Sequence, residues 1–195
     1  SSYKQLGQKE KACELYRRAL DEGLGGSSAE FARMGYADLS FELERYSDAY
    51  AAYLQICGSD SASARGLDPY LGVLRSAYRG RMWEETLSAA DQILRRTTVE
   101  AYVREAKYDQ AKAYMSTSRR DEAMKLFVLL SEAPATPEGA EATVALIQDL
   151  FDRGRFEDVE TRVYDFASEC GSQSYWLARS YIILADSFAE RGNME

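Results

Sequence analysis

The side chain most often used for acid–base and metal chemistry is missing from this chain. It contains no histidine, the commonest general base and metal ligand in proteins. The carboxylate pairs Glu84-Glu85 and Glu157-Asp158 each follow a turn, where a helix should begin. Carboxylates at such positions interact favourably with the positive end of a helix dipole. We therefore interpret these pairs as helix starts and not as catalytic pairs.

The cysteines and the glycine cluster favour structural roles. Cys13, Cys57 and Cys170 are odd in number and far apart, which fits neither a disulfide framework nor a zinc site, so we interpret them as small core residues. The segment Gly23 to Gly26 follows no predicted strand, so it is expected to end a helix and not to cradle a phosphate. We accordingly expect no catalytic residues, no metal and no cofactor.

Charge and composition narrow the class of partner. Acidic residues outnumber basic ones by 32 to 24, and the net charge of -8 repels phosphate backbones and anionic membrane surfaces. The longest apolar run, Ile182 to Ala185, is far shorter than the roughly 20 residues of a membrane-spanning helix. We therefore expect neither nucleic-acid binding nor direct membrane insertion. The hydrophobic content of 46% and the three prolines favour an all-α fold with a sizeable core.

A repeated segment organises the whole chain. Segments consisting of a turn and a helix begin at Lys9, Tyr46, Trp83, Arg120 and Phe156, which are 37, 37, 37 and 36 residues apart. In each helix a small or apolar residue lies three places on and a larger apolar residue, in most cases, lies seven places on, which makes one apolar stripe. A second helix is expected before each later turn, at Phe31–Leu43, Pro69–Tyr78, Val99–Met115, Glu138–Phe151 and Tyr175–Ala189.

Capping residues support these helix starts and divide the array. Asp68 and Thr136 each stand directly before a proline, as an N-cap residue does, and Thr97 or Thr98 and Ser174 are candidate caps for two other helices.

The predicted domain is a single array over 1–195 with partial repeats at 1–24 and 174–195 and full repeats at 27–61, 63–98, 99–134 and 136–171. Neither end has a polar capping face, so we expect a segment of a longer protein.

The recurring residues resemble the tetratricopeptide repeat (TPR) family. Its pattern is carried by Gly7 to Ala12 with Tyr16, Ala19 and Leu20; by Ala37 with Tyr46, Ala49 and Tyr53; by Ala111 with Ala123 and Phe127; and by Leu184, Ala185, Phe188 and Gly192. The family's turn glycine is replaced by Glu44, Arg81 and Ser118, and the period is about three residues longer than usual. The resemblance implies a right-handed α-solenoid of antiparallel helix pairs.

The resemblance also implies where a partner would bind. In this family the first helices of successive repeats line a concave face, which here comprises Met34, Asp38, Leu71, Arg75, Tyr78, Arg79, Tyr108, Lys112, Met115 and Gln148. Arg75, Arg79 and Lys112 would form a basic patch that suits a peptide with acidic and apolar side chains. Alternatively, these charges only solvate a helix face or pair with Asp38 and Asp152.

The function that follows is binding and not catalysis. We expect a protein–protein interaction scaffold that binds a peptide or protein partner on the concave face. The alternative is a structural module that self-assembles through its repeat ends, because exposed apolar end faces associate readily. Met34 and Asp38 stand where the carboxylate clamp of chaperone-binding repeats has lysine and asparagine, which disfavours chaperone tails. The segment from Ser174 to Gly192 is similar to repeats of bacterial cell-envelope proteins, which implies the periplasm or outer membrane, with the cytoplasm as the alternative.

Overall fold

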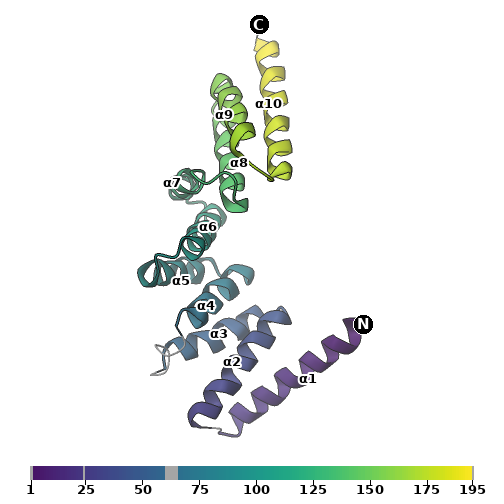
Figure 1. Cartoon of the computed structure of the whole chain (residues 1–195), viewed down its shortest axis with the longest axis vertical. Coiled ribbons are helices and arrows are strands. Elements are labelled where there is room, and N and C mark those ends of the chain that lie inside the picture. Colours follow the sequence, from purple (N-terminus) through teal and green to yellow (C-terminus); the bar gives the residue numbers. More distant parts are fainter. Residues whose placement is uncertain (1, 24, 60–65, 195) are drawn as a thin grey trace. The chain divides into compact units, whose positions relative to one another are not determined.

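The structure is a computed structural model that describes residues 2–23, 25–59 and 66–194, and within these ranges it contains helices and turns but no strand (Figure 1). The all-α prediction is therefore confirmed. The helices are α1 (Ser2–Asp21), α2 (Gly26–Glu42), α3 (Tyr46–Cys57), α4 (Asp68–Arg79), α5 (Trp83–Arg96), α6 (Glu100–Ser116), α7 (Arg120–Leu130), α8 (Pro137–Asp152), α9 (Phe156–Glu169) and α10 (Ser174–Met194).

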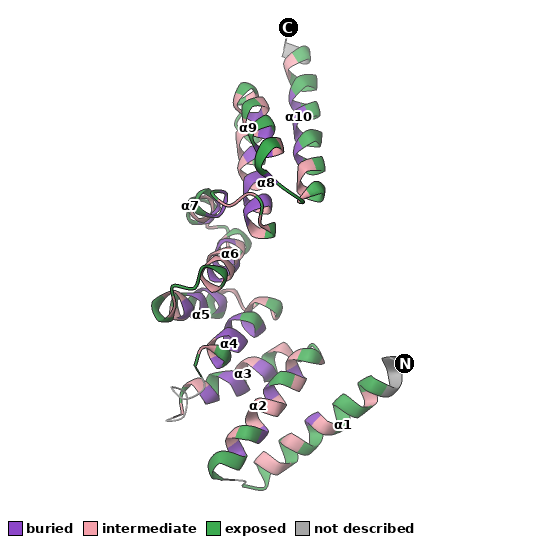
Figure 2. Cartoon of the chain, in the orientation of Figure 1, coloured by how far each residue is buried: buried purple, intermediate pink, exposed green. Residues whose placement is uncertain are grey.

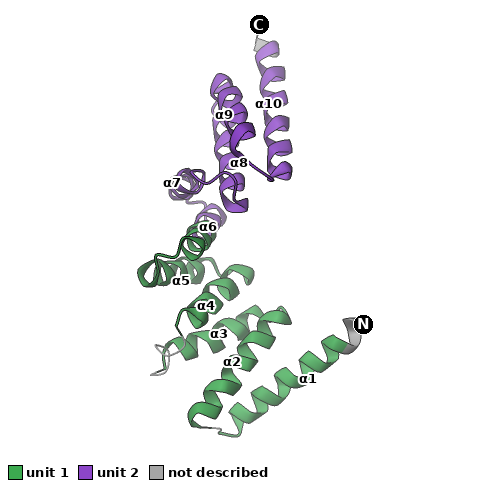
Figure 3. Ribbon diagram, in the orientation of Figure 1, with its two compact units in different colours: residues 1–109 green, residues 110–195 purple. Residues whose placement is uncertain are grey.

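The chain forms two compact units, residues 1–109 and 110–195, which divide within α6 (Figure 3). In unit 1 the helices α1 to α5 each pack against the next, and in unit 2 the helices α7 to α10 do the same. This consecutive packing is what a helical repeat requires, because each helix pair buries its apolar stripe against its neighbours.

Each unit has its own core. In unit 1 the centre of the core consists of Ala37, Ala49, Ile56, Leu71, Leu74 and Ile93. In unit 2 it consists of Ala140, Ile147, Val159, Val163, Phe166 and Leu184. Figure 2 shows buried positions along one side of several helices in each unit and exposed positions along another side. The predicted core cysteines Cys13 and Cys170 are buried, whereas Cys57 is only half-buried, and all three are free thiols.

The turns within successive helix pairs share one backbone structure. Glu44, Arg81, Ser118 and Gly154 have φ values of 59, 56, 61 and 70°, and they are 37, 37 and 36 residues apart. In each turn the next residue donates a backbone hydrogen bond of 2.8–2.9 Å to the carbonyl five residues earlier. This hydrogen bond and the left-handed residue together define a Schellman-type helix end. The period seen in the sequence is thus repeated in the backbone.

Two helix–helix contacts in unit 1 also recur at the same interval. A Cβ atom placed on Gly35 would lie 2.6 Å from the Tyr16 ring, and one placed on Gly72 would lie 2.6 Å from the Tyr53 ring. Both residues of the second contact lie 37 positions after those of the first, since Tyr53 follows Tyr16 and Gly72 follows Gly35 by that number. Since no side chain larger than hydrogen fits there, glycine lets the ring rest against the backbone of the next helix.

Two predicted helix caps need correction. Ser174 is the first residue of α10 and not the residue before it. Asp68 does not cap α4, because it is the first helical residue and Leu67 occupies the cap position without a side-chain hydrogen bond. Thr136 does cap α8, and its hydroxyl oxygen accepts from the Gly139 N–H at 3.1 Å. Of the small residues that carry the repeat pattern, Ala49 and Ala123 are fully buried, whereas Ala185 is exposed on α10.

Candidate partner-binding site

Unit 1 contains a cavity of about 300 Å³ that brings together four of the residues predicted for partner binding. They are Met34 and Asp38 on α2 and Leu71 and Arg75 on α4. Phe41, Asp68, Tyr53 and Gly72 complete the lining. Met34 and Asp38 are four residues apart, as are Leu71 and Arg75, so each pair lies on one face of its helix.

A tyrosine supports one carboxylate of this cavity. Tyr53 is 6% exposed, and its hydroxyl donates a 2.6 Å hydrogen bond to Oδ1 of Asp38. Burial raises the pKa of Tyr53 above its usual value, and the hydrogen bond to Asp38 raises it further. The hydroxyl therefore remains a neutral donor near pH 7. Its ring rests against Gly72, so the repeated ring–glycine contact also positions Asp38.

The arginine of the cavity is already paired. Nε and Nη2 of Arg75 donate to the two carboxylate oxygens of Glu105 on α6, at 2.6 and 2.8 Å. This hydrogen bond raises the pKa of Arg75 above its usual value. A bidentate pair satisfies both partners, so Arg75 adds little attraction for a further anion. With Asp38 and Asp68 also present, the cavity is more acidic than basic.

The other predicted residues of unit 1 lie outside this cavity. The rings of Tyr78 and Tyr108 meet edge to face with centroids 6.4 Å apart, and Tyr78 meets Trp83 in the same way at 6.2 Å. Arg79 is exposed in the last turn of α4, where a positive charge interacts favourably with the helix dipole. These side chains form an aromatic cluster with one arginine beside it in sequence, and not a free basic patch.

Lys112, Met115 and Gln148 lie in unit 2. Nζ of Lys112 lies 2.6 Å from a carboxylate oxygen of Glu141, and Gln148 donates to Oδ1 of Asp152 at 2.8 Å. Met115 is 41% exposed. The alternative that these cations pair with carboxylates therefore holds for Arg75 and Lys112. Their partners are Glu105 and Glu141, however, and not the predicted Asp38 and Asp152. The spacing in the sequence could have indicated these two ion pairs, because Glu105 follows Arg75 by 30 residues and Glu141 follows Lys112 by 29.

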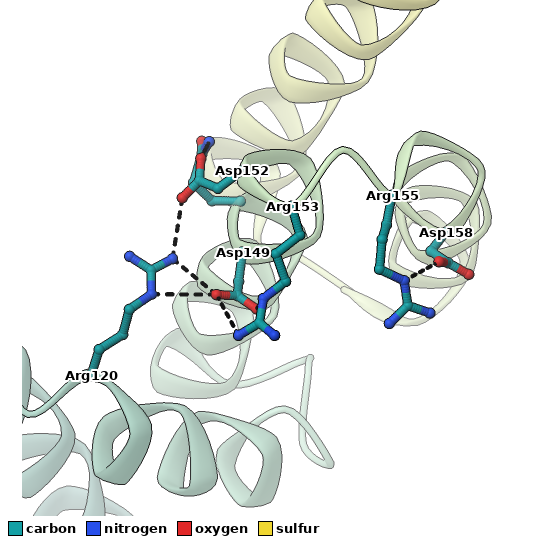
Figure 4. Close-up of polar contacts among 7 residues, drawn as sticks. Arg120, Asp149, Asp152, Arg153, Arg155 and Asp158 are labelled. Atoms are coloured by element: carbon teal, nitrogen blue, oxygen red, sulfur yellow. Dashed lines mark hydrogen bonds and ion pairs between the residues drawn. The ribbon is translucent and has the colours of Figure 1, made fainter.

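A charge cluster joins α7 to α8 in unit 2 (Figure 4). Nη2 of Arg120 lies 2.9 Å from Asp149 and 3.1 Å from Asp152, and Arg153 approaches Asp149 to 2.8 Å. Burial raises the pKa of Asp149, but the hydrogen bonds from Arg120 and Arg153 outweigh this effect, so the pKa is lower than usual. The cluster satisfies its own charges and is a structural feature.

Sequence reasoning missed a second hollow in unit 1. This α3–α5 groove, of about 420 Å³, is lined by Tyr50, Leu54 and Cys57 of α3, Tyr70 and Val73 of α4, and the face of α5 from Glu85 to Arg96. The guanidinium of Arg96 stacks 4.0 Å above the centroid of the Tyr70 ring. The family resemblance implies binding at the first helix of each pair, whereas α3 and α5, which form the walls of this groove, are second helices.

Among the residues that the structure describes, no group of three or more acidic, cysteine or histidine side chains is placed to hold a metal ion. None of the helices in the described ranges combines the length and apolarity needed to cross a membrane. Comparison with known protein families and with curated protein sequences found no match to this chain.

Proposed function

We propose that this chain is a protein-interaction module that receives a peptide segment of a partner in the cavity lined by Met34, Asp38, Leu71 and Arg75. The supporting observation is that residues selected from two successive repeats line one cavity. Its apolar side chains can bury part of a partner side chain, while its carboxylates fix the orientation. The function proposed is binding alone, without catalysis.

The chemistry of the cavity favours a basic and apolar segment. Asp38 and Asp68 supply two carboxylates, whereas the guanidinium of Arg75 is paired with Glu105. A lysine or arginine of the partner would therefore gain an ion pair, and an adjacent leucine or phenylalanine would contact Met34. The acidic peptide expected from the sequence would instead meet these carboxylates.

With this function we propose a TPR-like architecture, a right-handed superhelix of antiparallel helix pairs. Two observations support it: the same left-handed turn recurs at 44, 81, 118 and 154, and the ring–glycine contact recurs after 37 residues. In such an array the first helices of successive repeats line a common face, which is where we place the peptide.

The test begins with a library of random peptides displayed on phage and selected on the immobilised protein. We expect the selected peptides to combine lysine or arginine with a large apolar residue. A labelled selected peptide is then titrated against Asp68→Asn, measured by fluorescence anisotropy. We expect about threefold to fivefold weaker binding, because one exposed ion pair is lost.

Asp48→Asn is the matched control, because Asp48 also stands exposed in the first turn of a helix but does not line the cavity. It should leave the affinity within about twofold, since surface changes away from a site have small effects. The proposal fails if no peptide is enriched, or if the two variants weaken binding equally.

A second candidate function is self-association through apolar helix faces. Tyr175 and Ile182, seven residues apart on one face of α10, are 63% and 62% exposed, and Leu15 on α1 is 64% exposed. Successive helices of this chain cover one another's apolar faces, so the face of α10 can pack against α1 of a second copy in a head-to-tail contact. Sedimentation of Ile182→Glu tests this: we expect assemblies of the original protein to become monomers. An original protein that is monomeric at all concentrations would exclude it.

A further inference from the structure

We infer that the α3–α5 groove of unit 1 is a second binding surface, which receives one amphipathic helix of a partner protein. The inference does not depend on the proposed function, because the groove and the cavity share no lining residue among those described. Failure of one proposal therefore leaves the other unaffected.

The groove has the shape of a seat for a helix. On one wall Tyr50, Leu54 and Cys57 follow one another at intervals of four and three residues along α3. This spacing puts the three side chains on one face of that helix. On the opposite wall, α5 presents the small residues Ser88 and Ala89. Small residues let a partner helix approach closely between larger side chains.

The floor of the groove is α4, which packs against both α3 and α5. It contributes the half-buried Tyr70 and the buried Val73. Leu54 at the rim is 48% exposed, so a partner can still cover apolar surface there. An apolar stripe at helical spacing, with an exposed leucine at its rim, is the feature that helix-in-groove recognition uses.

The charges at the two ends select the occupant. Arg96 stacks on Tyr70 at 4.0 Å and donates to Gln92, including a 3.0 Å bond to the Gln92 carbonyl. Among the described residues it has no carboxylate partner. At the other end of the same face lies exposed Glu85. The two residues are 11 positions apart, which corresponds to about 16 Å along a helix axis.

This charge pattern also sets the direction of the bound helix. A carboxylate of the partner pairs best with the held guanidinium of Arg96, and a lysine or arginine three turns further along pairs with Glu85. Acidic residues stabilise the first turn of a helix and basic residues the last. The partner helix that satisfies both requirements has an acidic first turn, an apolar stripe and a basic last turn, and it lies antiparallel to α5.

The probe is a synthetic fluorescein-labelled peptide of about 18 residues, long enough to form a helix of several turns. It carries glutamates in its first turn, leucines along one face and lysines in its last turn. A reversed peptide has the lysines first and the glutamates last, with the same leucines. We expect the full chain to bind the first peptide about tenfold more tightly than the reversed one, measured by fluorescence anisotropy.

Exchange of the two charges of the groove provides the decisive variant. Glu85→Arg combined with Arg96→Glu should reverse the preference, so that the reversed peptide binds more tightly. Arg95→Glu is the matched control, because Arg95 is exposed in the same helix turn but does not line the groove. It should keep the original preference. Circular dichroism establishes that each variant is folded, and if the double variant does not fold, Arg96→Gln should weaken binding of the first peptide about threefold.

Cys57 reports where the peptide binds. It lies in the groove, whereas Cys13 and Cys170 are buried elsewhere. Burial raises the pKa of the Cys57 thiol to about 11, so alkylation is slow and can be followed over time by mass spectrometry. The bound peptide should slow the alkylation of Cys57 further. Octanoate, a small apolar ligand, is tested beside the peptides. The inference is overturned if neither peptide binds, if the double variant keeps the original preference, or if octanoate protects Cys57 from alkylation and the peptides do not.

Discussion

The two units pack the same repeat positions with different side chains. In unit 1 the rings of Tyr16 and Tyr53 rest on Gly35 and Gly72. Counted from the turn residues, Phe127 of unit 2 corresponds to Tyr53. Ala145 corresponds to Gly72, because it lies nine residues before Gly154 as Gly72 lies nine before Arg81. Alanine there adds a methyl group where unit 1 has bare backbone, and unit 2 adds the Arg120–Asp149 cluster between α7 and α8. The comparison teaches that the common turn preserves the period, while each unit fills its helix contacts in its own way.

The largest effect is expected in unit 2 from Phe127→Ala. Phe127 is 3% exposed, and removal of a buried phenylalanine ring costs about 3–5 kcal/mol of the free energy of unfolding. The control Arg119→Ala should cost less than about 1 kcal/mol, because it removes a partly exposed side chain.

Tryptophan fluorescence during urea unfolding can separate the two units, since Trp83 lies in unit 1 and Trp176 in unit 2. With Trp83→Phe as background, only Trp176 reports. Phe127→Ala should then lower the urea midpoint clearly, while Arg119→Ala should hardly change it. Similar midpoints for the two variants would show that Phe127 is not central to the packing of unit 2.

A smaller effect is expected in unit 1 from Gly72→Ala. The added Cβ would lie 2.6 Å from the Tyr53 ring, and overpacking of this kind costs about 1–3 kcal/mol. Gly7→Ala in α1 is the control, because nothing lies within 4 Å of the added atom, so higher helix propensity should stabilise the chain by up to about 1 kcal/mol. Opposite shifts in the thermal midpoint would sharpen the comparison. If Gly72→Ala also stabilises the chain, the ring–glycine contact is not tight.

The smallest effect concerns Asp149 and depends on pH. Its pKa is lower in the folded chain than in the unfolded one, so its pairing with Arg120 and Arg153 stabilises the fold fully above the unfolded value of about 3.9. This contribution is lost as the pH falls through the folded pKa.

Asp149→Asn should therefore reduce the free energy of unfolding by no more than about 1 kcal/mol at pH 7, and by less as the pH approaches 3. Urea unfolding of both proteins across this range gives the difference directly. Asp152→Asn, at a more exposed partner of Arg120, should show a smaller difference. A difference that stays constant with pH would mean that the charge of Asp149 does not matter.

The period of the sequence predicted much of the fold but less of the sites. The period predicted that Met34, Asp38, Leu71 and Arg75 would lie near one another. The reason is that residues at equivalent positions on the first helices of successive repeats lie on one face. The partner of Arg75 was missed, since pairing between helices depends on side-chain conformation as well as on spacing.

The groove was missed for a different reason. Arg96 of α5 stacks on Tyr70 of α4, and the two residues are 26 positions apart. No local sequence motif predicts this contact. The ring–glycine contacts were equally invisible, because Gly35 and Gly72 lie inside helices, where glycine is unfavourable on propensity alone. Only the position of the neighbouring ring explains them.

The left-handed turns have one further consequence. Their geometry is imposed by backbone hydrogen bonds, and the side chains of Glu44, Arg81 and Ser118 are all exposed. The chain can therefore carry a negative charge, a positive charge, a hydroxyl group or, at Gly154, no side chain at these equivalent places without altering the hairpin. The side chain exposed at each of these four turns can therefore change without changing the spacing of the helices.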